Sequence, residues 1–347
     1  PCSGRTTARR VALLHDGADG IMQGGIDIVV ALAQQLTRSQ PSQQLVIVTR
    51  GAQVTTPAQA GMPKTNAPCA GVWGFGRTLR LEHPALNSCS CDIMGEHVDT
   101  MIRTLQNEAE IVATNKNQYT LWLRRHSAVT AKSSAASLSG GWLVTGGLGG
   151  LGLRGAALLS SSGVKRIVLS SRSGLVAHHG QGLAERLHAL GATVIVAACD
   201  GGDYTQAVAL GMRSLAQGVL HAAGVVHDTL MLRMQASVIR SVLSPKAGAA
   251  LLLHSSYAII AIEALVLFSS GVATLGNPGQ ANYAAANSTL DSLAVCRRGC
   301  GLASSSLQPS NVGSVGIAKA ANDAGLHAPS WSLGLEEYAK SLGTLLA

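Results

Sequence analysis

Short apolar runs alternate with segments of helical periodicity along most of this chain. In the first half, residues 11–15 and 45–49 are predicted to be buried strands, and apolar residues between 26 and 36 recur at helical spacing. In the second half, strands are predicted at 142–146, 166–171, 193–200, 218–224 and 264–270, with helices near 151–162 and 180–190. Strands that are apolar on both faces and alternate with helices indicate a parallel sheet covered on both sides.

Two Rossmann-like α/β subdomains follow from this pattern. The small, polar stretch 128–140, AVTAKSSAASLSG, is typical of a linker, so we predict a truncated structural subdomain at 1–138 and a catalytic, doubly wound parallel sheet at 139–347. The turn after the first strand reads HDGADG and lacks the glycine triplet that lets a backbone approach a pyrophosphate. The first subdomain is therefore predicted not to bind a dinucleotide.

Composition narrows the function classes. The 26 Lys and Arg residues exceed the 18 Asp and Glu residues and give a net charge of +8, but they are scattered, and Arg124–Arg125 is their longest cluster. Without basic patches interleaved with aromatic residues, nucleic-acid binding is not expected. The 40 glycines and the low charged fraction of 13% are typical of an α/β enzyme rich in tight turns, or of a domain partly covered by neighbours.

The spacing of the cysteines and histidines in the sequence does not match that of a metal site. The seven cysteines form no CxxC pair, and His178, His179 and His188 have no carboxylate or cysteine partner at ligand spacing. We therefore expect no metal and a reducing, cytoplasmic compartment. No run of 18 uncharged apolar residues occurs, so no membrane span is predicted, and because the chain starts at Pro1 without a signal pattern we expect a segment of a longer polypeptide.

One glycine motif stands in the right context for a dinucleotide. It follows a predicted strand, opens a predicted helix, and fits both GxGxxG and TGxxxGxG. Such a turn lets the backbone approach a pyrophosphate and presents a helix N-terminus to it. The residues assigned to this role are Thr145, Gly146, Gly147, Leu148, Gly149, Gly150, Leu151 and Gly152.

The second predicted strand of this half ends in Ser170, Ser171 and Arg172. Folds that prefer NAD place an acidic residue there for the ribose 2′-hydroxyl, whereas an arginine favours a 2′-phosphate. We therefore predict NADPH as cofactor, with Arg172 as a solvated loop residue the alternative. Asp200, at the end of the third strand, is a candidate for the adenine amino group or simply a turn former.

A third set, Ser270, Tyr283 and Asn287, lies in FSSGVATLGNPGQANYAAAN. Tyr283 and Asn287 are four residues apart and so share one helix face, and Ser270 ends a strand whose carboxyl end lies at the same sheet edge. Buried tyrosines with bonded hydroxyls are common, so these spacings alone leave a packing role open.

Together these motifs resemble a known family. TGGLGGLG, SSRSG, HAAGV, SPKAGAALLLH and LVLFSSGVATLGNPGQANYAAAN, in this order, look like the ketoreductase domain of modular polyketide synthases, a branch of the short-chain dehydrogenase/reductase superfamily. GVWGFGRTLRLEHP and NKNQYTLWLRRH in the first half resemble the non-catalytic structural subdomain of that family. The resemblance thus covers nearly the whole chain.

By this resemblance Tyr283 is the general acid, Ser270 holds the substrate carbonyl, Lys246 supports the tyrosine, and Asn287 completes the set. Lysine and asparagine stand in the exchanged positions that mark ketoreductases within the superfamily. The resemblance implies reduction of a β-ketoacyl thioester on an acyl carrier protein, with neighbouring polyketide synthase domains as partners. The stretch after His221, namely Ala222, Ala223 and Gly224, borders the expected cofactor cleft; we interpret His221 as a packing and backbone-spacing element.

The resemblance also bears on stereochemistry. Of the Leu-Asp-Asp tripeptide that follows HAAGV in B-type ketoreductases, only Asp228 is present. Pro278 and Asn282 match the B pattern, and Leu275 stands where the A type carries tryptophan. B-type stereochemistry is therefore expected.

Two segments differ from the ketoreductase pattern and favour an alternative function. Residues 308–312, QPSNV, replace a tryptophan-containing element that is expected near the nicotinamide and the substrate entrance, and the segment 200–221 is short. These changes leave open a catalytically inactive structural or interaction domain. A free-standing dehydrogenase acting on small alcohols is a third possibility, which the appended first half argues against.

Overall fold

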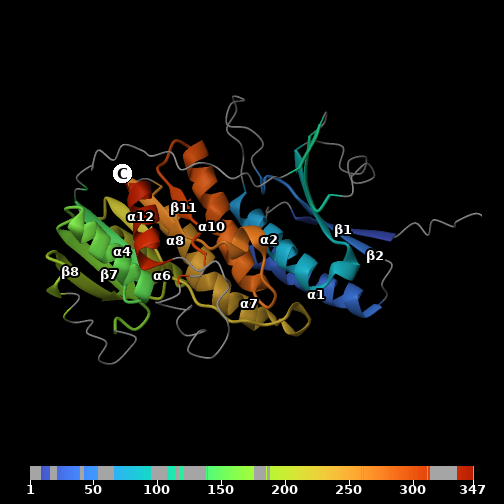
Figure 1. Ribbon diagram of the computed structural model, residues 1–347, viewed down its shortest axis with the longest axis horizontal. Helices are drawn as coiled ribbons and strands as arrows, with labels where there is room; N and C mark the ends of the chain where they lie inside the picture. Colours follow the sequence, from blue (N-terminus) through green and yellow to red (C-terminus); the bar gives the residue numbers. More distant parts are fainter. Residues whose placement is uncertain are drawn as a thin grey trace, which may run out of the picture. The chain divides into compact units, whose positions relative to one another are not determined.

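The computed structural model of the 347-residue chain contains two compact units, each discontinuous in sequence (Figure 1). Unit 1 comprises Pro1–Arg125, His227–Arg240 and Val272–Cys300, and unit 2 comprises His126–Val226, Ser241–Gly271 and Gly301–Ala347. The structure describes residues 9–15, 22–39, 43–53, 66–94, 108–114, 117–120, 138, 140–175, 185, 188–258, 260, 262–310, 312 and 334–346. The predicted linker 128–140 lies mostly outside these residues, and the functional boundary between 138 and 139 stays a prediction.

Unit 1 is built on a five-stranded sheet with the order β1-β2-β3-β4-β5. Its strands are β1 (Arg9–His15), β2 (Gln43–Thr49), β3 (Cys89–Met94), β4 (Glu110–Thr114) and β5 (Gln118–Thr120). The first four are parallel, and β5 runs antiparallel to β4. The helical elements of this unit are α1 (Met22–Ser39), α2 (Ala67–Glu82), η1 (Pro84–Leu86), η2 (Met231–Arg233), α9 (Val272–Leu275) and α10 (Ala281–Gly299).

Helices α2 and α10 pack closely because their facing residues are small (Figure 1). A Cβ atom at Gly74 of α2 would overlap the carbonyl of Ala284 and the hydroxyl of Ser288. Along α10, Ala281, Ala284, Ala285, Ala286 and Leu290 are all fully buried. Helix α10 carries Tyr283, so the first half of the chain supports this candidate catalytic residue through close helix packing.

Unit 2 is built on a six-stranded, all-parallel sheet with the order β11-β10-β9-β6-β7-β8. The strands are β6 (Gly141–Thr145), β7 (Arg166–Ser171), β8 (Thr193–Ala198), β9 (Gly218–His221), β10 (Ala264–Phe268) and β11 (Ser305–Leu307). This order reverses between β6 and β9, which is the doubly wound topology in which ligands bind at the carboxyl edge. The fold class predicted from the sequence is confirmed.

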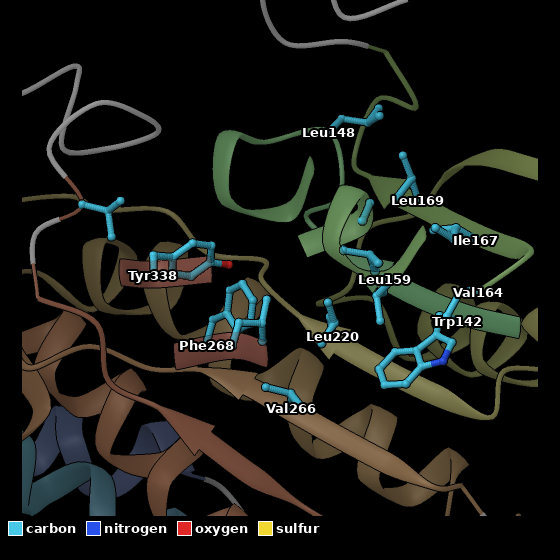
Figure 2. Packing of buried hydrophobic residues seen from close by; sticks show 14 residues of the cluster. Trp142, Leu148, Leu159, Val164, Ile167, Leu169, Leu220, Val266, Phe268 and Tyr338 are labelled. Carbon is cyan, nitrogen blue, oxygen red and sulfur yellow. The ribbon is translucent and has the colours of Figure 1, made fainter. Parts of the chain in front are cut away.

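One face of this sheet carries a large hydrophobic core beneath α4 (Gly150–Ser161) and α12 (Leu335–Leu346). Trp142 and Val144 of β6 point into it, and the rings of Phe268 and Tyr338 meet edge to face with centroids 5.9 Å apart (Figure 2). The neighbouring residue Leu143 is fully buried outside this cluster, as strand alternation requires. On α6 (Tyr204–Ser214), a Cβ atom at Gly211 would lie 3.0 Å from Ser256 Cβ of α8 (Ala249–Ser256), so these two helices pack closely.

A continuous helical stretch joins α7 (Ala236–Leu243), a π-helical turn η3 (Ser244–Gly248) and α8. Among the described residues, 236–256 alone is long and apolar enough to cross a membrane by length and composition, and 44% of its most apolar window is buried. The helix predicted near 180–190 lies largely outside the described residues.

Candidate active site

The glycine turn after β6 is closely packed against the strand end of β9. Gly146 has a φ of +66°, and a Cβ atom there would lie 2.7 Å from the backbone nitrogen of Ala223. A Cβ atom at Gly152 would lie 2.8 Å from the Cα of Gly147. Both positions therefore require glycine, and the backbone can approach where side chains would otherwise stand.

Helix α4 begins in this turn without a capping side chain. Its N-cap is Gly149, and no side-chain hydrogen bond caps the start of the helix. A helix N-terminus of this kind carries unsatisfied N–H groups and a partial positive charge that suit a phosphate. The glycine cradle and uncapped helix thus fit the pyrophosphate of a dinucleotide. Leu148 and Leu151 lie in the hydrophobic core or pack against it, so they support the turn from below.

Ser171 and Asp200, which are predicted to lie near the adenine and ribose of the cofactor, form turns in the structure. The Ser171 hydroxyl accepts a hydrogen bond from Gly174 N at 3.1 Å, and the Asp200 carboxylate accepts one from Gly202 N at 3.0 Å. Arg172 is exposed after the carboxyl end of β7. Asp200 therefore forms a turn after β8, and its contact with adenine stays a prediction.

His221 joins the glycine turn to the lysine-bearing helix. Its Nδ1 lies 2.8 Å from Thr145 Oγ1, and its Nε2 lies 2.8 Å from the carbonyl oxygen of Lys246. Burial, reinforced by the charge of Lys246, lowers the pKa of His221 to about 4, so the ring is neutral at pH 7. Because the carbonyl can only accept, Nε2 carries the proton, and Thr145 donates to Nδ1. The sequence predicts a packing and spacing role for His221, and in the structure its ring makes two hydrogen bonds, to Thr145 and to the Lys246 carbonyl.

Lys246 lies in the π-helical turn η3 and is only 4% exposed. Its Nζ donates to the carbonyl of Phe268, the last residue of β10, at 2.9 Å. A Cβ atom at Gly224 would lie 3.2 Å from this Nζ, so glycine leaves room for the ammonium group. π-Helical turns are rare and often mark functional sites because they re-aim one side chain.

Ser270 follows β10 by two residues in the same unit. The backbone on either side of Ser270 is hydrogen-bonded to residues 307–309, since Ser269 N donates to Leu307 O at 2.8 Å and Gly271 N donates to Pro309 O at 3.1 Å. Pro309, in the altered segment 308–312, therefore contributes one of the backbone contacts beside Ser270.

Tyr283 and Asn287 lie in unit 1 on α10, where Asn287 Nδ2 donates to the carbonyl of Tyr283 at 2.8 Å. Asn282 is fully buried and makes two bonds: its Oδ1 accepts from Tyr283 N at 2.7 Å, and its Nδ2 donates to the carbonyl of His227 at 3.0 Å. Asn282 thus ties the start of the tyrosine helix to the segment that contains Asp228.

The other proposed stereocontrol residues lie beside this helix start. Gln280 Nε2 donates to Asp228 Oδ1 at 3.0 Å, a contact the sequence did not predict. Leu275 is 43% exposed at the end of α9, and Pro278 is exposed in the following turn. The structure thus groups Asp228, Asn282 and Tyr283 in unit 1, and Lys246 and Ser270 with the glycine turn in unit 2.

Metal ligation finds no support in the described part of the chain. No group of three or more His, Cys, Asp or Glu side chains there could hold a metal ion. None of the cysteines that the structure describes forms a disulfide. His178 and His179 lie outside the described residues.

Comparison with known proteins identifies the family. The KR domain model matches residues 140–313. The chain is 35% identical over 298 residues to polyketide synthase GfsA of Streptomyces halstedii, a match covering 82% of this chain and 4% of that protein. A solved A1-type ketoreductase superposes with a TM-score of 0.82 at 30% identity, covering 92% of this chain and 69% of the other.

A second solved structure, of A-type ketoreductases from a modular polyketide synthase, gives a TM-score of 0.80 at 31% identity, covering 90% of this chain and 69% of the other. The chain spans only 4% of the length of its relative GfsA, so what a whole synthase does is a separate question. The family model, the fold and the glycine turn agree with the resemblance drawn from the sequence. The chain belongs to the KR domain family, the ketoreductases of polyketide synthases.

Proposed function

We propose that this domain reduces a β-ketoacyl thioester, carried on an acyl carrier protein, to the β-hydroxyacyl thioester with NADPH. Members of the family are NAD(P)-dependent ketoreductases, which supports the reaction class. The observation that carries the proposal is the buried ammonium of Lys246, which a neutral carbonyl holds in the same unit as an uncapped glycine turn. A solvated, merely structural lysine would not be buried in this way.

The chain's own residues would handle the developing charge on the substrate oxygen. The cofactor supplies the hydride when bound. Ser270 and Tyr283 donate hydrogen bonds to the carbonyl oxygen as negative charge builds on it, and such preplaced donors account for much of enzymatic rate enhancement. Tyr283 gives its proton to that oxygen, Lys246 stabilises the phenolate that remains, and Asn287 holds the helical turn of Tyr283 through its carbonyl.

The preference for NADPH rests on Arg172. An exposed guanidinium after the second strand can pair with a 2′-phosphate, and no acidic residue stands at 170–172 to bind a 2′-hydroxyl. Thr145–Gly152 would hold the pyrophosphate, with Ser171, Asp200 and Ala222–Gly224 beside it. Neighbouring synthase domains would deliver the substrate, and we place the protein in the cytoplasm.

B-type stereochemistry is the finer part of the proposal. It rests on Asp228, Pro278 and Asn282 and on Leu275 in place of tryptophan. The hydrogen bonds of Asp228 and Asn282 support it, because both residues are tied to the start of the helix that carries Tyr283.

The test is NADPH oxidation with a β-ketoacyl-N-acetylcysteamine thioester or trans-decalone, comparing wild type with Tyr283→Phe. We expect kcat of Tyr283→Phe to fall by about 10²- to 10⁴-fold, because a general acid usually contributes this much to the rate. Its affinity for NADPH should change little. Gly146→Ala should abolish NADPH binding, whereas Gly343→Ala on α12 of the same unit, whose Cβ would meet nothing within 4 Å, serves as its control. Folded wild-type protein that never binds NADPH would instead support the inactive structural domain.

A further inference from the structure

Helix α2 ends at Glu82, and this side chain bridges two distant segments of unit 1. Its Oε2 accepts a hydrogen bond from Met231 N at 2.7 Å, and its Oε1 accepts one from Gly279 N at 2.9 Å. Both oxygens of one carboxylate thus bind backbone amides that lie 149 and 197 residues further along the chain. No salt bridge to Glu82 occurs in the described residues, so its carboxylate is stabilised by hydrogen bonds from backbone N–H groups.

The two bridged segments lead to residues of the proposed active site. Met231 begins η2, three residues after Asp228, and Gly279 stands four residues before Tyr283 with a φ of +82°. The segments also bond each other: Thr229 N donates to Gly279 O at 2.7 Å, and Gln280 Nε2 donates to Asp228 Oδ1 at 3.0 Å. Glu82 therefore closes a hydrogen-bonded ring that fixes one segment against the other.

A second side chain from the first half of the chain holds only one of these segments. Gln34 of α1 donates through Nε2 to the carbonyls of Met231 at 2.8 Å and Met234 at 2.9 Å. It contacts the 231–234 segment alone, whereas Glu82 reaches both. This difference provides an internal control for the role of the carboxylate.

We propose that Glu82 is a positioning residue that sets the stereochemical outcome of reduction by fixing the Asp228 segment against the helix start that carries Tyr283. The proposal rests on the proposed ketoreductase function. In the part of the chain that the structure describes, the Glu82 carboxylate accepts hydrogen bonds from backbone amides only, so we expect it to act through Asp228 and Tyr283. Hydrogen bonds from amides to a charged acceptor are stronger than neutral ones, and a partly buried carboxylate holds both amides where an amide side chain could serve only one.

The first measurement is hydrogen exchange of the Met231 and Gly279 amides in the full chain. In Glu82→Gln the new NH₂ group faces one backbone N–H, and the neutral oxygen accepts only weakly from the other. We therefore expect exchange to speed up by about 10- to 100-fold at one of the two positions, or in its peptide, and by less at the other. Gln34→Leu should loosen 231–234 and leave Gly279 protected, and the exposed Glu108→Gln should change neither. Should Glu82→Gln fold poorly, Glu82→Asp, which is too short to reach both amides, replaces it.

The second measurement is the ratio of product stereoisomers formed from a β-ketothioester. Glu82→Gln should erode the wild-type ratio by about tenfold, whereas Gln34→Leu and Glu108→Gln retain it; a merely structural role would lower the melting temperature without moving this ratio. Unchanged exchange in Glu82→Gln overturns the proposal whatever the activity, and faster exchange with an unchanged ratio overturns it as well. Wild type without turnover would refute the proposed function instead, and the exchange data would still decide whether Glu82 holds the two segments.

Discussion

Both units contain a sheet with parallel strands, but different groups occupy the carboxyl ends of these strands. In unit 1, Asp92 of β3 is fully buried and accepts hydrogen bonds from the Thr49 hydroxyl at 2.7 Å and from Ala52 N and Gln53 N at 3.0 Å each. The indole of Trp73 donates to the same Thr49 oxygen at 2.8 Å. Side chains that satisfy one another close the carboxyl ends of β2 and β3.

In unit 2 the corresponding edge combines a side-chain bridge between Thr145 and His221 with a glycine turn and backbone contacts. The turn after β6 has no capping side chain at the start of α4, and Lys246 donates to the carbonyl at the end of β10. We therefore expect that a parallel α/β sheet alone does not make a cofactor site. We expect binding to require glycines at the strand ends that leave backbone N–H groups for a ligand, and not side chains that satisfy the edge internally.

Removing the carboxylate that closes unit 1 should have the largest effect on stability. Asp92→Ala leaves the Thr49 hydroxyl and the amides of Ala52 and Gln53 buried without their acceptor, so we expect the free energy of unfolding to fall by about 3 to 5 kcal/mol. Denaturant titration measures this loss. NADPH affinity of the protein that remains folded should be unchanged, because unit 2 is untouched.

Asp92→Asn is the matched control for this prediction. The amide keeps one acceptor oxygen and removes a charge whose burial raises the pKa of Asp92, so its cost should be about 1 to 2 kcal/mol. A loss below about 1 kcal/mol in the alanine variant would contradict the view that this network closes the edge.

Much of unit 2 could be predicted from the sequence because its signals are local. Strand and helix periodicity predicted β6, β7, β9 and β10, and the motif Thr145–Gly152 predicted the turn that the structure contains. The proposed catalytic residues were chosen by resemblance, and their roles stay predictions. The HAAGV motif drew attention to His221, but its two hydrogen bonds depend on groups 76 and 25 residues away.

The sequence did not predict the long-range hydrogen bonds, because the segments that they join have ordinary hydrophobic and polar patterns. Glu82 ends a helix with a polar residue, as many surface helices do, and its partners lie 149 and 197 residues away. The same holds for Asp92, the one charged residue of the buried strand β3. A buried polar residue within a strand is the signal that could have drawn attention to it.

The His221 bridge should make the open edge of unit 2 sensitive to acid. The unfolded chain takes up a proton near pH 6.5, whereas folded His221 does so only near its pKa of about 4, because burial and Lys246 disfavour the charged ring. The unfolded state binds more protons between these values, so stability is lost as pH falls from 6.5 to 4. The expected loss is about 3 kcal/mol.

Comparing the pH dependence of wild type with that of His221→Gln isolates this effect. Asp92 works in the opposite direction, since its raised pKa lets the folded state take up a proton before the unfolded state does. It is present in both proteins, so its contribution cancels in the difference. Parallel stability curves between pH 7 and 4 would show that His221 is not the buried neutral bridge described above.

The smallest effect concerns the two non-glycine residues with positive φ among the described residues, one in each unit. Asn87 follows η1 at 43°, and Leu215 ends α6 at 47° in the short segment before β9. Asparagine tolerates this conformation, whereas leucine is strained in it, and Leu215 is 75% exposed, so its side chain contributes little packing. Leu215→Gly should therefore raise the free energy of unfolding by about 0.5 to 1 kcal/mol, and Asn87→Gly should change it by less than about 0.5 kcal/mol. Leu215→Ala keeps the strained Cβ and should gain nothing, which separates backbone strain from exposure. A gain equal to that of glycine would mean that Leu215 costs stability through its exposed side chain and not through its backbone.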